Sequence, residues 1–98
     1  METFRIQGRI YVDLNGWENQ EDNKFWVALD QPFTNRDLKD QAIELQEGII
    51  LSLWTDDLDE QNQFDPMLFE GVVHFDAERE RWVAIVDWNE IHHASEQT

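Results

Sequence analysis

The densest group of side chains that could do chemistry is the acidic segment TDDLDEQNQFD at residues 55–65. Its carboxylates belong to Asp56, Asp57, Asp59, Glu60 and Asp65. Oxygen-bearing side chains at Asp57, Asp59 and Gln61 have the alternate spacing found at the start of calcium-binding loops. The segment lacks the central glycine and the closing glutamate that such a loop needs. We therefore predict no metal site and expect a solvated loop, kept extended by the repulsion between its charges.

Histidine and serine, the other candidates for catalysis, are few and poorly placed for it. His92 and His93 are adjacent, so on a strand their rings would point to opposite faces and could not share a metal ion. Ser52 lies in an apolar stretch rather than on the exposed turn that a nucleophile needs. The chain has no cysteine, no glycine-rich phosphate-binding loop and no HExxH motif. These features predict a protein that is not an enzyme and that binds no cofactor.

The charge balance limits the partners of the chain. The formal net charge is −15, from 22 acidic and 7 basic residues. Nucleic acids and anionic membranes recruit cationic side chains, so we expect neither direct nucleic acid binding nor membrane binding. A basic protein partner is compatible with this charge. The carboxylates could also imitate nucleic acid phosphates and inhibit a basic DNA- or RNA-binding protein, in a complex that salt would weaken.

Alternating apolar and polar residues predict the strands that would carry these side chains. GRIYVD at 8–13 is followed by FWVALD at 25–30, and GVVHFD at 71–76 is followed by RWVAIVD at 81–87. Alternation at period two is typical of strands with two distinct faces. The short connector AERE at 77–80 suits a hairpin turn. We predict two similar hairpins, in which each Trp-Val-Ala marks the second strand.

One further strand and a helical segment complete the predicted fold. GIILSLW at 48–54 is rich in β-forming residues, and residues 90–93 allow for a sixth strand. Residues 36–46 are expected to form a short helix or helical turn, although their apolar positions also fit a partly extended segment. Five or six short strands with one helical turn predict a mainly β protein, a small antiparallel barrel that is SH3-like or else OB-like. We expect one domain over residues 1–93 and a flexible C-terminal tail over residues 94–98.

The order of LQEGIILSL and RWVA resembles the strand order of SH3-type barrels over the second half of the chain. The acidic and aromatic groove residues with which SH3 domains bind proline-rich peptides are absent from it. The resemblance therefore implies an architecture and no binding specificity.

The alternation also assigns a face to the aromatic residues. If the branched aliphatic residues point to the core, the opposite face carries Trp26, Trp82, Trp88, Tyr11 and His74. Tryptophan and tyrosine supply much of the binding energy at protein interfaces. We therefore predict that these five residues contact a protein partner. A helix or loop that covers this face, or a homodimer that seals it, would explain the same pattern.

These features together favour a small, acidic, non-catalytic protein-interaction module or accessory subunit, with the nucleic-acid mimic as the alternative. A cytoplasmic location is expected, because the first residues do not resemble a signal peptide. No apolar run in the sequence approaches the roughly 20 residues that cross a bilayer.

Overall fold

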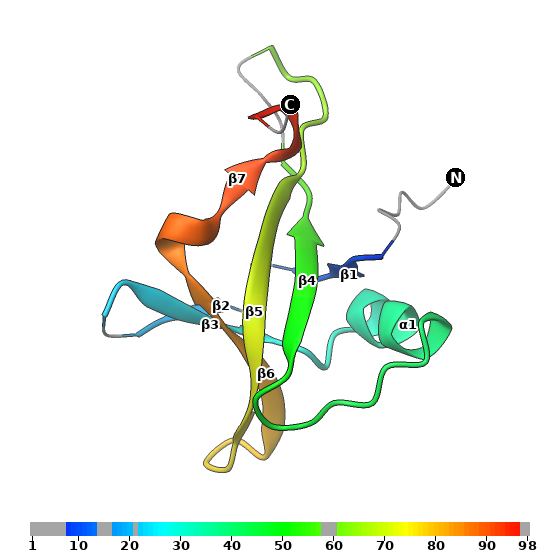
Figure 1. The fold of residues 1–98 in the computed structure, drawn as a ribbon, viewed down its shortest axis with the longest axis vertical. Helices are drawn as coiled ribbons and strands as arrows, with labels where there is room; N and C mark the ends of the chain where they lie inside the picture. Colours follow the sequence, from blue (N-terminus) through cyan, green and yellow to red (C-terminus); the bar gives the residue numbers. More distant parts are fainter. Residues whose placement is uncertain (1–7, 14–16, 21, 58–60, 97–98) are drawn as a thin grey trace.

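The computed structural model describes residues 8–13, 17–20, 22–57 and 61–96, which form one seven-stranded sheet with a helix at its edge (Figure 1). The strands are β1 (Ile10–Tyr11), β2 (Trp17–Asn19), β3 (Lys24–Ala28), β4 (Ile50–Thr55), β5 (Met67–Asp76), β6 (Arg81–Asp87) and β7 (His92–His93). The helices are α1 (Pro32–Asp40) and two short 3-10 helices, η2 (Trp88–Glu90) and η3 (Ala94–Glu96). The protein is therefore mainly β, as predicted. None of these helices is long and apolar enough to cross a membrane.

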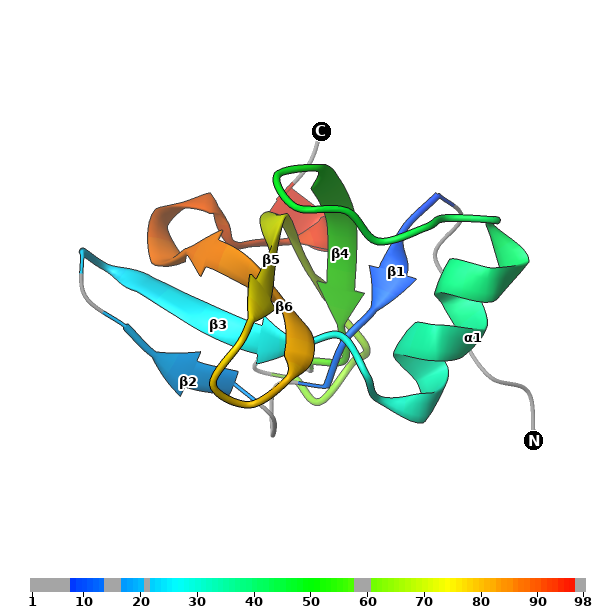
Figure 2. The ribbon, with the colours of Figure 1, turned by 90° about the horizontal axis from the view of Figure 1, so that it is seen from below.

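The sheet is open, which corrects the predicted barrel. The strand order is β1-β4-β5-β6-β3-β2, with β7 paired to β5, and within the described residues β1 and β2 do not pair with each other. The sheet is also not wholly antiparallel, because β1 and β4 run parallel. α1 lies beside β1 at this end of the sheet (Figure 2). The backbone N–H of Tyr11 donates to Asp37 Oδ2 (2.9 Å), and the Thr34 hydroxyl donates to the Tyr11 carbonyl (2.7 Å). These bonds take the place of a further strand, so the sheet does not close there.

Only one of the two predicted hairpins is present. β5 and β6 pair from Val72↔Ile85 to Asp76↔Arg81 around the turn at 77–80, as predicted. The other prediction is wrong, because β1 pairs with β4 and β3 pairs with β2. The turn from β2 to β3 contains Asp22 and Asn23 at positive φ (63° and 61°), a conformation that Asp and Asn tolerate better than most residues. β7 lies within the predicted sixth strand.

The helix lies earlier in the chain than predicted. α1 begins with a proline at its first turn, a position where the missing N–H costs no hydrogen bond. It ends at Asp40, and Ala42 has a φ of 54° that no α-helix contains. Ile43 and Leu45 follow outside the helix and pack against the core while partly buried. After the turn at residues 41–42, residues 43–46 form neither helix nor strand.

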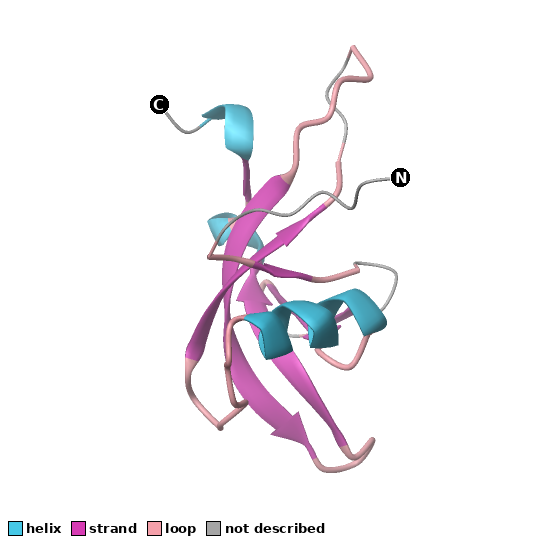
Figure 3. Cartoon of the chain, turned by 90° about the vertical axis from the view of Figure 1, so that its right-hand side faces the viewer, coloured by secondary structure: helices cyan, strands magenta, loops and turns pink. Residues whose placement is uncertain are grey.

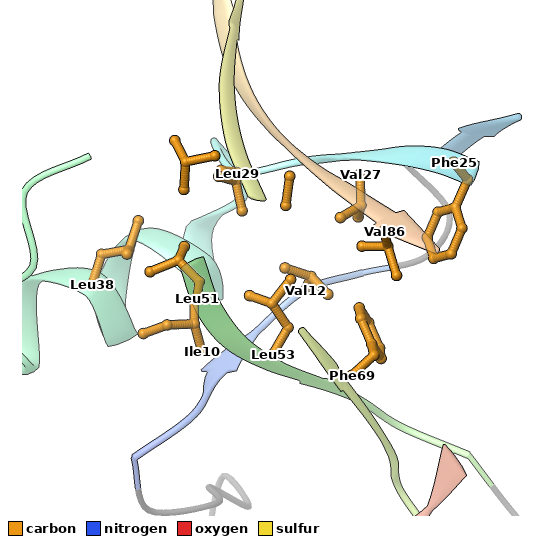
Figure 4. Close-up of a cluster of buried hydrophobic side chains, with 12 residues drawn as sticks. Ile10, Val12, Phe25, Val27, Leu29, Leu38, Leu51, Leu53, Phe69 and Val86 are labelled. Carbon is orange, nitrogen blue, oxygen red and sulfur yellow. The ribbon is translucent and has the colours of Figure 1, made fainter. Parts of the chain in front are cut away.

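The core lies between β1 and β4 on one side and β3 and β6 on the other, with side chains that point toward one another (Figure 4). Its buried members are Ile10, Val12, Phe25, Val27, Leu29, Leu38, Leu51, Leu53, Phe69, Val73, Ala84 and Val86. Figure 3 shows α1 lying across one side of the sheet, from where it contributes Leu38.

The two Trp-Val-Ala segments present opposite faces to this core. In the β3–β6 pair Val27 lies opposite Ala84 and Trp26 lies opposite Ile85, so the repeat is out of register by one residue. A shift of one residue exchanges the faces of a strand. The predicted phase is therefore correct in β3, where Val27 is buried in the core. In β6 the core cluster contains Ala84 and Val86 instead of Ile85, although Val83 is buried as predicted. Phe75 is exposed at its end of β5.

Candidate functional site

Four apolar side chains lie in line across four strands on the face of the sheet opposite the core, here called the outer face. Ile50 lies opposite Val72, Val72 opposite Ile85, and Ile85 opposite Trp26. Residues directly opposite each other on paired strands project from the same face. Ile50 is 66% exposed and Val72 is 41% exposed, while Ile85 and Trp26 are partly buried. We call this set, Ile50, Val72, Ile85 and Trp26, the apolar row.

The row arises because several strands contain adjacent apolar residues. Ile50 precedes Leu51, Val72 precedes Val73, and Ile85 follows Ala84. In each pair the second named residue is buried in the core, so strand alternation turns its neighbour to the outer face. In these three strands apolar side chains therefore lie on both faces of the sheet, and those on one face pack in the core.

A cavity of about 300 Å³ adjoins the row where β5 and β6 separate. The two strands pair only as far as Val72↔Ile85, and beyond that point β5 pairs with β7 instead. The cavity is lined by Lys24, Ile50, Glu70, Gly71, Val72, Ile85, Asp87 and Glu90. It therefore combines aliphatic residues of the row with three carboxylates and one ammonium group.

None of these three carboxylates forms an ion pair with a residue in the described part of the chain. Glu70 accepts a long hydrogen bond from the Ser52 hydroxyl (3.4 Å). Asp87 accepts a hydrogen bond of ordinary length from the backbone N–H of Asn89 (2.9 Å). Both donors are neutral, so the negative charge at the cavity is not offset by these bonds.

A second cavity, of about 450 Å³, lies at the Trp26 end of the row, between the edge of β2 and the β5–β6 turn. Two of its acids, Glu18 and Asp76, are already paired with Arg79. Arg79 donates to Glu18 (2.8 Å) and lies 3.4 Å from Asp76, and these neighbours raise the pKa of its guanidinium. This cavity therefore contains a cation of its own.

The Trp26 ring is supported from the side of this second cavity. It contacts the His74 ring at a centroid distance of 5.2 Å, and His74 Nδ1 lies 2.8 Å from Glu47 Oε2. The other Glu47 oxygen accepts from the backbone N–H of Phe75 (3.0 Å). This backbone bond, followed by the bond to His74, lowers the pKa of Glu47. The carboxylate thus fixes the histidine against which the indole rests.

The five predicted partner-binding residues do not form one surface. Trp26 and His74 lie together on the outer face, whereas Trp82 packs against the core and contacts Phe75 at 5.2 Å. Trp88 belongs to η2 rather than to a strand, and its ring contacts the Phe25 ring at a centroid distance of 4.4 Å and an angle of 39°. Its indole N–H also donates to Asn19 Oδ1 (3.2 Å).

Tyr11, the fifth of these residues, belongs to a separate aromatic cluster with Phe33, Trp54 and Phe64. Tyr11 lies 5.9 Å from Phe33 and 4.9 Å from Trp54, which in turn lies 6.4 Å from Phe64. Phe33 and Phe64 are 51% and 44% exposed, and the Arg36 guanidinium lies 4.9 Å from the centre of the Phe33 ring. Burial, and then the nearby charge of Asp56, raise the pKa of Tyr11.

The described ends of the acidic loop are held by other segments rather than extended by repulsion. Asp57 Oδ2 lies 2.6 Å from His93 Nε2. Asp65, which is nearly buried, accepts from the Ser95 hydroxyl (2.6 Å) and from the Ser95 backbone N–H (3.0 Å). The hydroxyl bond is the main reason why the pKa of Asp65 is lowered.

The remaining predictions for this region are tested only in part. Asp56 accepts a long bond from the Tyr11 hydroxyl (3.4 Å), and Asp59 and Glu60 lie outside the described residues. Among the residues that the structure describes, no three His, Asp or Glu side chains are placed to hold a metal ion. Ala94–Glu96, expected to lie in the tail, form η3, while residues 97–98 lie outside the described residues.

Sequence reasoning missed Ile50, Val72 and the three carboxylates of the cavity beside them. Polar residues on the same strands could have shown which apolar residues lie on the outer face. Ser52, Glu70 and Asp87 each lie two residues from a member of the row on the same strand, which is the spacing of one strand face.

Comparison with protein-family models, with curated proteins and with solved structures found no significant match to this chain.

Proposed function

We propose that this protein is a small, non-catalytic interaction module of the cytoplasm that binds a protein partner through the apolar row. The observation that carries the proposal is the register that aligns Ile50, Val72, Ile85 and Trp26 on the face opposite the core. Large contiguous apolar surface is uncommon on monomers and marks contact sites, and the row places the exposed Ile50 and Val72 next to the partly buried Ile85 and Trp26.

Trp26 is the expected anchor of the contact. Tryptophan is enriched among the residues that dominate binding energy. Its ring rests on His74, which Glu47 holds in turn, so little side-chain entropy remains to be lost when a partner binds. The other members of the row are aliphatic and carry no group that could form or break a covalent bond. These properties favour recognition over catalysis.

A test compares the apolar row with the aromatic cluster of Tyr11. The protein, Ile50→Ser/Val72→Ser and the matched control Phe33→Ser/Phe64→Ser are each immobilised and exposed to a lysate of the native cell. Each variant removes two exposed apolar side chains. A protein captured by the unmodified chain is then purified, and its Kd for all three is measured by calorimetry.

We expect Ile50→Ser/Val72→Ser to weaken binding at least tenfold, equivalent to about 1.4 kcal/mol. The control should change the Kd less than twofold. The opposite result would place the contact on the aromatic cluster. If neither variant changes the Kd but the complex dissociates at high salt, the nucleic-acid mimic is favoured, because charge alone would then hold the complex together.

A further inference from the structure

We infer that the partner contributes an arginine or lysine whose head group lies among Glu70, Asp87 and Glu90, in the cavity beside the apolar row. This inference rests on the proposed function and specifies the chemistry of the partner. It follows from the shape of the cavity, from its charge and from the ion pairs that other arginines of the chain already form.

The shape suits one long cationic side chain. Val72, Ile85 and Ile50 supply aliphatic surface, and the carboxylates stand beside them. Lysine and arginine lay their aliphatic stems on apolar surface while the charged head reaches a polar region. The volume of about 300 Å³ is at the lower limit for small-molecule sites, which usually span roughly 300–1,000 Å³. A single inserted side chain is therefore a better occupant than a free ligand.

The charge of the cavity points to a cation from outside the chain. Three arginines are already engaged with acids elsewhere: Arg36 with Asp37 (2.9 Å), Arg81 with Asp30 (2.6 Å), and Arg79 with Glu18. Among the residues that the structure describes, Lys24 is the one cationic residue that lines the cavity, against three carboxylates. With 22 acidic and 7 basic residues, the chain cannot neutralise its own acids. A partner's cation would form charge-assisted bonds there.

The same charge disfavours a second copy of the chain as the occupant. In a two-fold dimer the same surface patch lies on both sides of the contact, so the carboxylates of the two cavities would be brought together. Each copy also carries a net charge of −15, which opposes association. A basic segment of a different protein has neither problem.

The experiment titrates peptides into the isotopically labelled full chain and follows backbone amide shifts by NMR. The probe is a nine-residue peptide that alternates valine and arginine. Its control carries citrulline, which keeps the shape of arginine and loses its charge. Protein variants are Glu70→Gln/Glu90→Gln and the matched pair Glu44→Gln/Glu80→Gln, which removes the same number of negative charges outside the cavity. Asp87 is kept because it caps η2.

We expect the arginine peptide to shift Gly71, Val72 and Ile85, and the citrulline peptide to bind at least fivefold more weakly. Glu70→Gln/Glu90→Gln should weaken binding of the arginine peptide at least fivefold, and the matched pair less than twofold. Equal weakening by the two pairs, shifts confined to the Glu18–Arg79 cavity, or no binding at millimolar peptide would each overturn the inference.

Failure of this inference can be separated from failure of the proposed function. The captured partner is measured against Glu70→Gln/Glu90→Gln as well as Ile50→Ser/Val72→Ser. If only the second variant weakens its binding, the apolar row remains the contact surface and the cationic side chain is refuted. If neither variant has an effect, both proposals fail.

Discussion

Gly71 offers the sharpest test of the register that creates the apolar row. A methyl group at this position would lie 2.9 Å from Ala84 Cβ, 3.0 Å from Leu53 Cδ1 and 3.2 Å from Val86 Cγ2. The Leu53 methyl can rotate away, but the Ala84 Cβ is fixed to its backbone and cannot. Gly71→Ala should therefore overpack the core between β4, β5 and β6.

The magnitude follows from two opposing effects. One added methyl group in a packed core costs about 1–3 kcal/mol. Replacing a strand glycine by alanine returns roughly 0.5–1 kcal/mol through the entropy of the unfolded chain. We expect a net loss of about 1 kcal/mol in the free energy of unfolding, and hence a Tm lower by roughly 4–8 °C for a domain of this size.

The assay is urea unfolding followed by tryptophan fluorescence, with Gly71→Ala measured alone and together with Ala84→Gly. Removing the Ala84 methyl group eliminates the closest contact, so Gly71→Ala should cost less in that background than in the unmodified chain. A neutral or stabilising effect of Gly71→Ala in the unmodified chain would refute the reasoning. Gly71 would then not face the core, and the assignment of Val72 to the outer face would fail with it.

Three further predictions concern exposure, pH and the sheet edge. Ile50→Ser should change the free energy of unfolding by less than about 0.5 kcal/mol. Leu53→Ala should cost about 2–5 kcal/mol, so equal urea midpoints for the two variants would contradict the assigned faces. The Ser95 hydroxyl holds the pKa of Asp65 below its ordinary 3.8, so this bond stabilises the fold above that pH and is lost as the pH falls through the folded pKa. The difference in urea midpoint between the unmodified chain and Ser95→Ala should thus shrink between about pH 5 and pH 2, and a constant difference would refute it. Asp37→Leu should cost about 1–3 kcal/mol and expose the edge of β1, with self-association visible by light scattering, whereas a stable monomer would contradict this role.

Residue alternation was enough to predict the mainly β class and the β5–β6 hairpin, because both depend on local sequence. It could not predict that β1 pairs with β4 in parallel, since parallel strands are not joined by a short turn that the sequence would reveal. The start of α1 could have been predicted from Pro32, because proline is common in the first turn of a helix. The apolar periodicity of residues 36–46 instead placed the predicted helix too late in the chain.

The faces of β6 show why the partner surface was harder to predict than the fold. Val83, Ala84, Ile85 and Val86 are consecutive apolar residues, so periodicity alone cannot decide which of them is buried. Matching β6 to β3 by their shared Trp-Val-Ala chose the wrong phase, because the register sets Trp26 opposite Ile85. The next polar residue, Asp87, marks the outer face correctly, and counting back two residues leads to Ile85.

The most direct test of the apolar row as a contact surface is a methyl NMR spectrum of the full chain, recorded free and then bound to its captured partner. If the account is right, the largest changes in chemical shift occur at the methyl groups of Ile50, Val72 and Ile85, while those of Leu53 in the core change little. Unchanged Ile50 and Val72 methyl groups in a saturated complex would contradict it.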